Sequence, residues 1–157
     1  MNLLSQIAKQ FRDVHFGGNW TAVNLKDTLA GITWQQATTK IDSFNTVAAL
    51  VFHINYYVGG MLQYIQQGEL TIRDKYSFNH PPIASDEDWN KLLDKTWTEA
   101  ESFASMLEQL PETKLDEIFF DEKYGNYYRN FHGLIEHTHY HLGQIVLIKK
   151  MIVKARQ

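Results

Sequence analysis

Apolar residues recur at intervals of three and four along most of the chain, which is the spacing that places them on one face of an α-helix. A shorter helical stretch is expected over residues 21–29, after a Gly17-Gly18-Asn19 break. Four longer segments carry the same pattern, and we predict long helices over residues 3–15, 43–67, 86–110 and 130–154. Four amphipathic helices in a chain of 157 residues predict an all-α fold, an antiparallel four-helix bundle.

Residues typical of helix ends support these boundaries. Either Asp42 or Ser43 is suited to cap the start of the second long helix, and Gly68 is suited to end it. Ser85 is suited to cap the third long helix, whose first turn carries three acidic residues that favour the positive end of the helix dipole. We therefore predict that these two helices begin near residues 43 and 86.

Two of the connections between helices differ in character. Residues 69–84 contain the run Asn79-His80-Pro81-Pro82 and are expected to form a long ordered loop. Aromatic pairs flank Tyr124-Gly125-Asn126, so a small hairpin before the last helix, over Phe119–Tyr128, is the one strand pair that the pattern allows. Because nothing divides the pattern, we expect a single domain over residues 1–157.

Composition and charge exclude several classes of protein. The net charge is −3 with Lys and Arg scattered, which argues against a nucleic-acid partner. The longest apolar run, Val47–Phe52, is far shorter than the roughly 18–20 residues that span a bilayer, so no membrane partner is expected. Arg12 and Asp13 come too early for a secretory signal, and we expect a cytoplasmic protein. The absence of Cys excludes disulfides, thiolate metal sites and a cysteine nucleophile.

The histidines of the last predicted helix divide between its two faces. A helix advances about 100° per residue, so His137 and His141 lie about 40° apart. Both fall within the apolar stripe, whereas His132 and His139 fall on the opposite, polar face and are expected to be solvated or at the surface. The stripe itself consists of Leu134, Ile145, Ile148 and Ile152. The pattern therefore predicts that His137 and His141 point into the bundle.

Two inward histidines four residues apart have the spacing of a metal chelate. His53, on the second long helix, shares its face with small and apolar residues and is also predicted to point inward. A single inward histidine is usually a hydrogen-bonded core residue, so a purely structural role stays open. A divalent metal ion at His53, His137 and His141 is the alternative, with His15 as a weaker candidate ligand and His80 as a loop residue. A b-type haem held by His53 and one partner also stays open.

Several segments resemble the DinB/YfiT-like family of four-helix-bundle metalloenzymes. The resemblance covers nearly the whole chain and rests on the order of GGNWTAVNL, DTLAGITWQQA, LVFHIN and HTHYHLGQI, with an H-x-x-x-H-x-G-Q motif near the end. It implies one metal ligand on the second helix and two on the last, which map onto His53, His137 and His141. Members often carry Arg after the last motif histidine, whereas this chain has Leu142. Any contact that such an arginine makes is absent here.

The resemblance also implies a range of activities. Three neutral ligands leave a divalent ion its full charge and one to three open positions, as in catalytic sites. Zinc or nickel suits imidazole best, and iron or manganese is also compatible. Characterised relatives include S-transferases and isomerases that use bacillithiol, mycothiol or glutathione, so we expect a thiol-dependent transferase acting on small electrophiles. A metal-dependent hydrolase and a non-catalytic bundle that binds a small ligand or forms a dimer are the alternatives.

The second long helix also provides candidate pocket residues and a second apolar stripe. Tyr57, Gly60 and Tyr64 share the His53 face, and with Gln144 they are our candidates for a substrate pocket. Gly60 indicates either space for a substrate or close packing between helices. The second stripe lies opposite His53 and packs either within the chain or against a second copy in a homodimer; it consists of Val47, Val51, Val58, Leu62 and Ile65.

Overall fold

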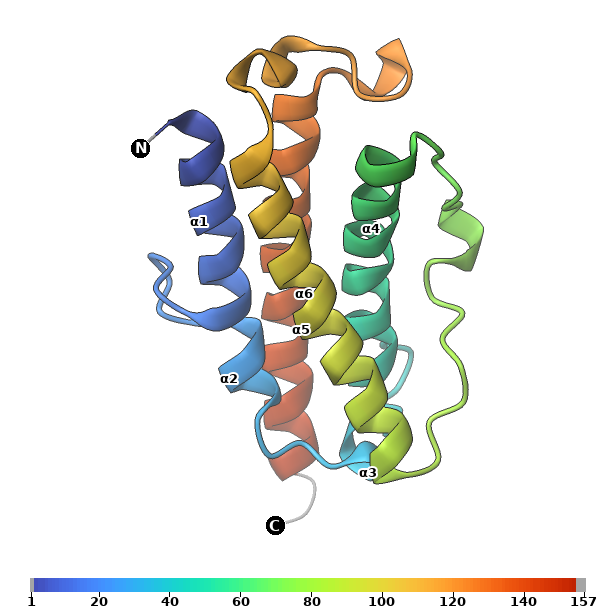
Figure 1. Ribbon diagram of the computed structural model, residues 1–157. Coiled ribbons are helices and arrows are strands. Elements are labelled where there is room, and N and C mark those ends of the chain that lie inside the picture. The colour runs from blue at the N-terminus through green and yellow to red at the C-terminus, as the bar shows by residue number, and fades with distance from the viewer. Residues whose placement is uncertain (1, 155–157) are drawn as a thin grey trace.

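The computed structural model describes residues 2–154, which form an all-α bundle without β-strands in that range (Figure 1). Two short helices, α2 (Leu25–Leu29) and α3 (Trp34–Ala37), follow the first long one. The four long helices are α1 (Leu3–Phe16), α4 (Val47–Gln67), α5 (Asp86–Gln109) and α6 (Tyr127–Lys154). The all-α prediction is therefore confirmed. None of the helices within residues 2–154 combines the length and apolar character that a bilayer crossing requires.

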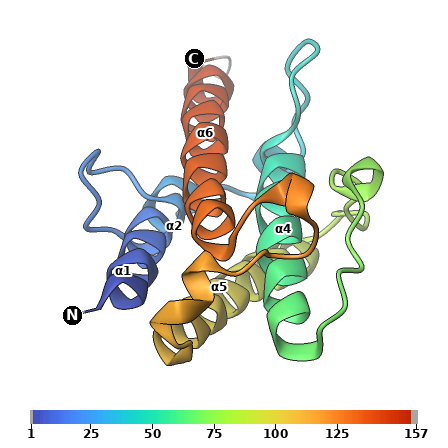
Figure 2. The same ribbon diagram turned by 90° about the horizontal axis from the view of Figure 1, so that it is seen from above.

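The long helices enclose two clusters of buried apolar residues, with α4 and α6 as neighbours on one side (Figure 2). Helices α1 and α6 run in one direction, and α4 and α5 run in the opposite direction (Figure 1). Helices α4 and α6 are therefore antiparallel, whereas α4 and α5 run in the same direction. This arrangement requires residues 68–85 to return along the outside of the bundle, and we call this segment the crossover loop.

The boundaries of α4 and α5 agree with the sequence except at one end. Gly68 ends α4 in the left-handed conformation (φ 79°), and Ser85 caps α5 by accepting a hydrogen bond from the backbone of Asp88, both as predicted. The predicted caps Asp42 and Ser43 are wrong, because the side chain of Thr46 caps α4 at Val47. Asp42 instead lies in a turn, where its φ is +44°.

The predicted hairpin before the last helix is reduced to one antiparallel bridge. Ile118 pairs with Asn126, and a short 3₁₀ turn, η3 (Glu122–Tyr124), connects them. The bridge cannot extend into a ladder because α6 begins at Tyr127, three residues earlier than predicted. The Asn126 side chain accepts a hydrogen bond from the backbone N–H of Arg129, as a capping residue does.

The second apolar stripe of α4 packs within the chain. Val47, Val51 and Val58 are fully buried and Leu62 is 8% exposed, while Ile65 packs at the edge of the cluster that contains Val58 and Leu62. Helix α5 is the principal neighbour of α4, so it covers much of this stripe. The stripe accordingly supplies no free surface for a homodimer, and the homodimer stays an untested prediction.

The crossover loop is fixed to α4 by hydrogen bonds from aromatic side chains. The Tyr56 hydroxyl donates to the carbonyl of Arg73 and accepts from its N–H. The Tyr57 hydroxyl donates to Asp74 Oδ1 at 3.0 Å. Directly before these anchors, Ile72 lies so close to Gly60 that a Cβ on the glycine would be 2.4 Å from Ile72 Cγ2. The loop therefore lies directly on the α4 backbone at this point.

This contact predicts opposite effects for alanine at two helical glycines. Gly60→Ala is expected to lower the free energy of unfolding by about 1 kcal/mol, because displacement of Ile72 outweighs the gain in helix propensity. Gly143→Ala meets nothing within 4 Å and is the matched control, expected to raise it by about 0.5–1 kcal/mol. Urea unfolding of both variants measures the difference. A Gly60→Ala protein more stable than wild type would contradict the close packing.

Candidate metal centre

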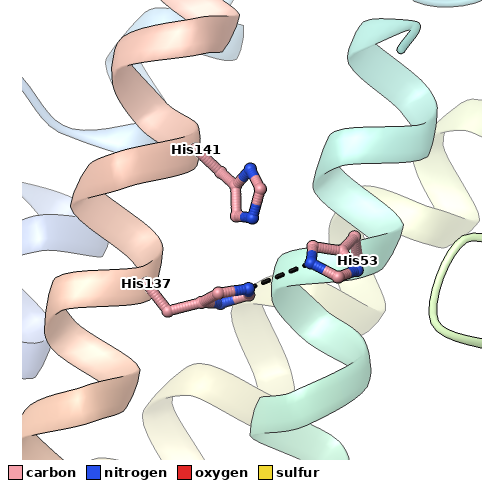
Figure 3. A group of neighbouring side chains, drawn as sticks. All are labelled: His53, His137 and His141. Carbon is pink, nitrogen blue, oxygen red and sulfur yellow. Dashed lines mark hydrogen bonds between the residues drawn. The ribbon is translucent and has the colours of Figure 1, made fainter. Parts of the chain in front are cut away.

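Three histidines converge between α4 and α6 (Figure 3). His53 lies near the middle of α4, and His137 and His141 lie one turn apart on α6. One ring nitrogen from each lies within 4.8 Å of those of the other two. The Nε2 atoms of His53 and His137 are 3.0 Å apart. The structure thus brings together the three histidines that helical periodicity predicts to point into the bundle.

The antiparallel neighbours α4 and α6 position these rings by simple helical geometry. His137 and His141 are four residues apart and so project from the same side of α6. His53 and His141 are each 7% exposed, and His137 is half-buried. Buried imidazoles without polar partners would be unfavourable, so their hydrogen bonds decide what the site can do.

Two of the rings are oriented by acceptors on their outer nitrogens. His53 Nδ1 is 3.3 Å from the carbonyl oxygen of Ser77, and His141 Nδ1 is 2.7 Å from Gln144 Oε1. Both partners can only accept, so each Nδ1 carries the proton and donates. The Nε2 atoms of His53 and His141 then carry lone pairs, and that of His53 accepts a hydrogen bond from His137 Nε2 at 3.0 Å. This is the tautomer of a metal ligand held by an outer-shell hydrogen bond.

His137 differs from the other two because its Nδ1 is buried and has no hydrogen-bond partner within the described residues. Its Nε2 faces the Nε2 of His53 (Figure 3). A ring with one orphaned nitrogen and the other directed at a second imidazole gains little from hydrogen bonding alone. This arrangement favours a role for Nε2 as a ligand atom.

Aromatic rings enclose the three histidines. Phe78, from the crossover loop, stacks on His53 with ring centroids 3.8 Å apart and planes 5° apart. Tyr57 meets both His53 and His137 edge to face, at 5.2 and 5.1 Å. These contacts limit water around the nitrogens and restrict rotation of the imidazoles.

Burial keeps His53 and His137 in the neutral form that binds metal. Burial lowers the pKa of His137 to about 4, and the neighbouring His141 and His53 add to the effect. Burial, followed by His141, also lowers the pKa of His53. Near neutral pH both rings are therefore unprotonated at one nitrogen and available to a cation.

The donor set fits a divalent ion. Imidazole nitrogens bind zinc at about 2.0–2.1 Å, so two ligand nitrogens of one ion lie at most about 4.2 Å apart. The 3.0 Å between the Nε2 atoms of His53 and His137 meets this limit, and separations of up to 4.8 Å in the cluster would shorten by a small ring rotation on binding. Three neutral donors without a carboxylate leave coordination positions for other molecules. The site accordingly suits an ion that takes part in chemistry rather than one that only cross-links helices.

The other histidines lie apart from this cluster. His15 is fully buried beside Phe11, whose carbonyl accepts from its Nδ1, so it is a core residue and no part of the centre. His80 lies in the crossover loop, where its Nδ1 donates to the carbonyl of Pro81. His132 and His139 are each half-buried and lie outside the cluster, so neither is fully solvated. Each packs at the edge of the bundle, because α6 has neighbours on more than one side.

The candidate pocket residues have separate roles in the structure. Tyr57 contacts two of the histidines, and Gln144 orients His141. The Tyr64 hydroxyl donates to the carbonyl of Phe119, which ties α4 to the segment before α6. Gly60 accommodates Ile72 of the crossover loop, although it also lines a cleft between α4 and α5.

One core residue beside the motif, Leu142, and two residues of the crossover loop also affect the surroundings of the histidines. Leu142, at the position where family members often carry Arg, is 3% exposed and belongs to the apolar core. Ser77 and Phe78, which orient and cover His53, escaped sequence reasoning. Both lie in a loop without helical periodicity. The nearby run Asn79-His80-Pro81-Pro82 indicated that this loop is ordered, but it did not indicate that either residue reaches His53.

A cleft of about 420 Å³ adjoins the centre at His137. It lies between α4, the crossover loop, the segment before α6 and the start of α6, and it is partly open to solvent. Tyr57 and Asp74 border it near the histidines. Its remaining lining includes Met61, Leu70, Ile72, Phe119, Lys123, Tyr124, Arg129, Asn130, Gly133 and Leu134. A small molecule in this cleft would therefore lie against a ring of the cluster.

The fold and the site define a helical-bundle protein with a three-histidine centre of the kind that holds a divalent metal ion. The model of the DinB superfamily matches residues 18–145, and the chain belongs to this superfamily. The resemblance drawn from the sequence motifs is thereby confirmed. Comparison with curated proteins and with solved structures gave no significant match.

Proposed function

We propose that this protein is a metal-dependent enzyme that transfers a low-molecular-weight thiol to small electrophiles. The observation that carries the proposal is the convergence of three imidazoles, two of them with the proton fixed on the outer nitrogen, beside an open cleft. His53, His137 and His141 would hold one divalent ion, with zinc or nickel best suited to imidazole and iron or manganese also compatible.

The side chains of the site would set the conditions for the reaction. A divalent ion bound there would lower the pKa of a coordinated thiol or water. The Ser77 carbonyl and Gln144 hold the outer protons of His53 and His141, so these rings keep their Nε2 lone pairs directed inward. Phe78 stacks on His53 and Tyr57 packs against it edge to face, which would limit the access of water to this ring. The chain has no Cys, so the thiol must come from a cosubstrate.

Tyr57 has a defined proton state in this scheme. Burial raises the pKa of its hydroxyl, which donates a hydrogen bond to Asp74 Oδ1. At neutral pH Tyr57 therefore keeps its proton and does not serve as a base. We infer that Tyr57 holds the crossover loop at the wall of the cleft through its hydrogen bond to Asp74. A leaving group would then take its proton from solvent or from the cosubstrate.

Turnover with and without thiol tests this function. Protein loaded with zinc or nickel is supplied in turn with bacillithiol, glutathione and mycothiol, each with a panel of small electrophiles, and S-conjugates are detected by mass spectrometry. We expect a conjugate with at least one thiol, lost in metal-free protein and in His137→Ala, and retained in the matched control His132→Ala.

The alternatives give different products in the same experiment. Ester or amide cleavage that proceeds without thiol would identify a hydrolase and contradict thiol transfer. A melting shift on ligand addition without any product would identify a binding protein. No conjugate above the metal-free control with any of the three thiols would overturn the proposal.

A further inference from the structure

The cleft beside His137 is apolar along its floor and polar at its far end. Met61 and Leu134 are 6% and 5% exposed, and Phe119 is 4% exposed, so the floor is part of the hydrophobic core. The crossover loop adds Leu70 and Ile72 as one wall. An elongated ligand with an apolar body would therefore be desolvated along this floor.

Two cationic side chains stand at the end of the cleft away from the histidines. Lys123 lies 3.9 Å from Asp121 and above the ring of Tyr124, so its charge is partly balanced. Arg129 has no carboxylate partner within residues 2–154. Across the cleft, Asp74 accepts a hydrogen bond from Tyr57. The guanidinium of Arg129 is thus an uncompensated cation beside an apolar floor.

Helix α6 fixes the distance between this cation and the metal centre. Arg129, Gly133 and His137 follow one another at intervals of four residues and all line the cleft. Eight residues of α-helix span about 12 Å at 1.5 Å per residue. Gly133 lies midway, and a Cβ there would have nothing within 4 Å. A glycine lowers helix stability relative to alanine. At this position its missing side chain leaves the helix backbone accessible to a ligand between the two polar ends of the cleft.

We propose that the cleft binds a small molecule with an apolar body and a terminal carboxylate. The carboxylate pairs with the guanidinium of Arg129, for which a two-pronged hydrogen-bond geometry is available. The body lies over Gly133 on Met61 and Leu134, and the opposite end reaches His137. The assignment of that opposite end as the reacting end rests on the function proposed above, whereas the recognition of the carboxylate does not.

Paired acids and alcohols test the carboxylate. Binding of octanoate and octanol to metal-free protein, and of mercaptooctanoate and mercaptooctanol to zinc-loaded protein, is measured by calorimetric titration. We expect each acid to bind roughly tenfold more tightly than its alcohol, as one charge-assisted hydrogen bond allows. Mercaptopropionate, which is too short to join the two ends, should bind zinc-loaded protein no better than its alcohol.

Three variants complete the test. Arg129→Gln should remove the preference for the acid without changing zinc content, and Lys150→Gln, an exposed charge near the other end of α6, should retain it. Gly133→Leu should weaken acid and alcohol alike. Equal binding of acid and alcohol to the wild type, or a preference that survives Arg129→Gln, would overturn the proposal. The metal-free titrations decide this even if no thiol transfer is found.

Discussion

Replacement of His53, His137 or His141 by alanine is expected to abolish the binding of about one divalent ion per chain, the stoichiometry of a single three-histidine site. Loss of an outer-shell partner typically weakens metal binding by about 10–100-fold, so loss of a ligand should weaken it by more than about 100-fold. Metal analysis of purified protein and calorimetric titration with zinc measure the effect. Wild-type protein with zinc at about 100 times its Kd should be stabilised by about 2.7 kcal/mol.

His139→Ala is the matched control for this experiment. His139 lies on α6 between two of the ligands and is half-buried, but its ring is not part of the cluster. Zinc binding should therefore be unchanged in this variant. The assignment of ligands fails if His139→Ala loses zinc while His137→Ala retains it.

The second large effect is expected on acidification of the metal-free protein. Burial lowers the pKa of His15 to about 4 from an ordinary value of 6.5. Between these values the unfolded chain takes up a proton that the folded chain does not, so stability present above pH 6.5 is lost as the pH falls towards 4. At about 1.4 kcal/mol per pH unit, His15 alone should remove up to about 3 kcal/mol.

Urea unfolding of wild type and His15→Leu at several pH values from neutral to about 4 separates this contribution. Leucine fills the buried site without a titrating group, so the variant should lose a smaller part of its stability on acidification. In the variant the carbonyl of Phe11 has lost its hydrogen-bond donor, which lowers the free energy of unfolding at every pH. The informative quantity is therefore the slope of the free energy of unfolding against pH. Identical slopes for the two proteins would contradict a neutral buried His15.

The convergence of the three histidines could be predicted because the direction of each depends only on local geometry. His137 and His141 are four residues apart within an apolar stripe, and helical periodicity alone turns such residues inward. His53 followed from the same argument applied to its own helix. The structure needed only to place α4 beside α6 for the three rings to meet.

The parts of the site that the sequence could not predict come from tertiary contacts. Ser77 and Phe78 reach His53 only because the crossover loop returns along α4, and no local pattern sets that path. The start of α4 was misplaced for a related reason. Three residues before α4 are of types that cap helices, namely Asp42, Ser43 and Thr46. The chain turns at Asp42, so the helix begins only after Thr46, which is the residue that caps it.

The path of the crossover loop separates access to the site from the integrity of the bundle. Phe78 covers His53 from this loop, whereas all three histidines stand on helices that form the core. Loops open at lower free energies than the helices beneath them. A local opening of this one surface segment would therefore uncover His53 while the three imidazoles keep their spacing. We expect changes within residues 68–85 to alter the exposure of the centre more than the free energy of unfolding of the whole protein.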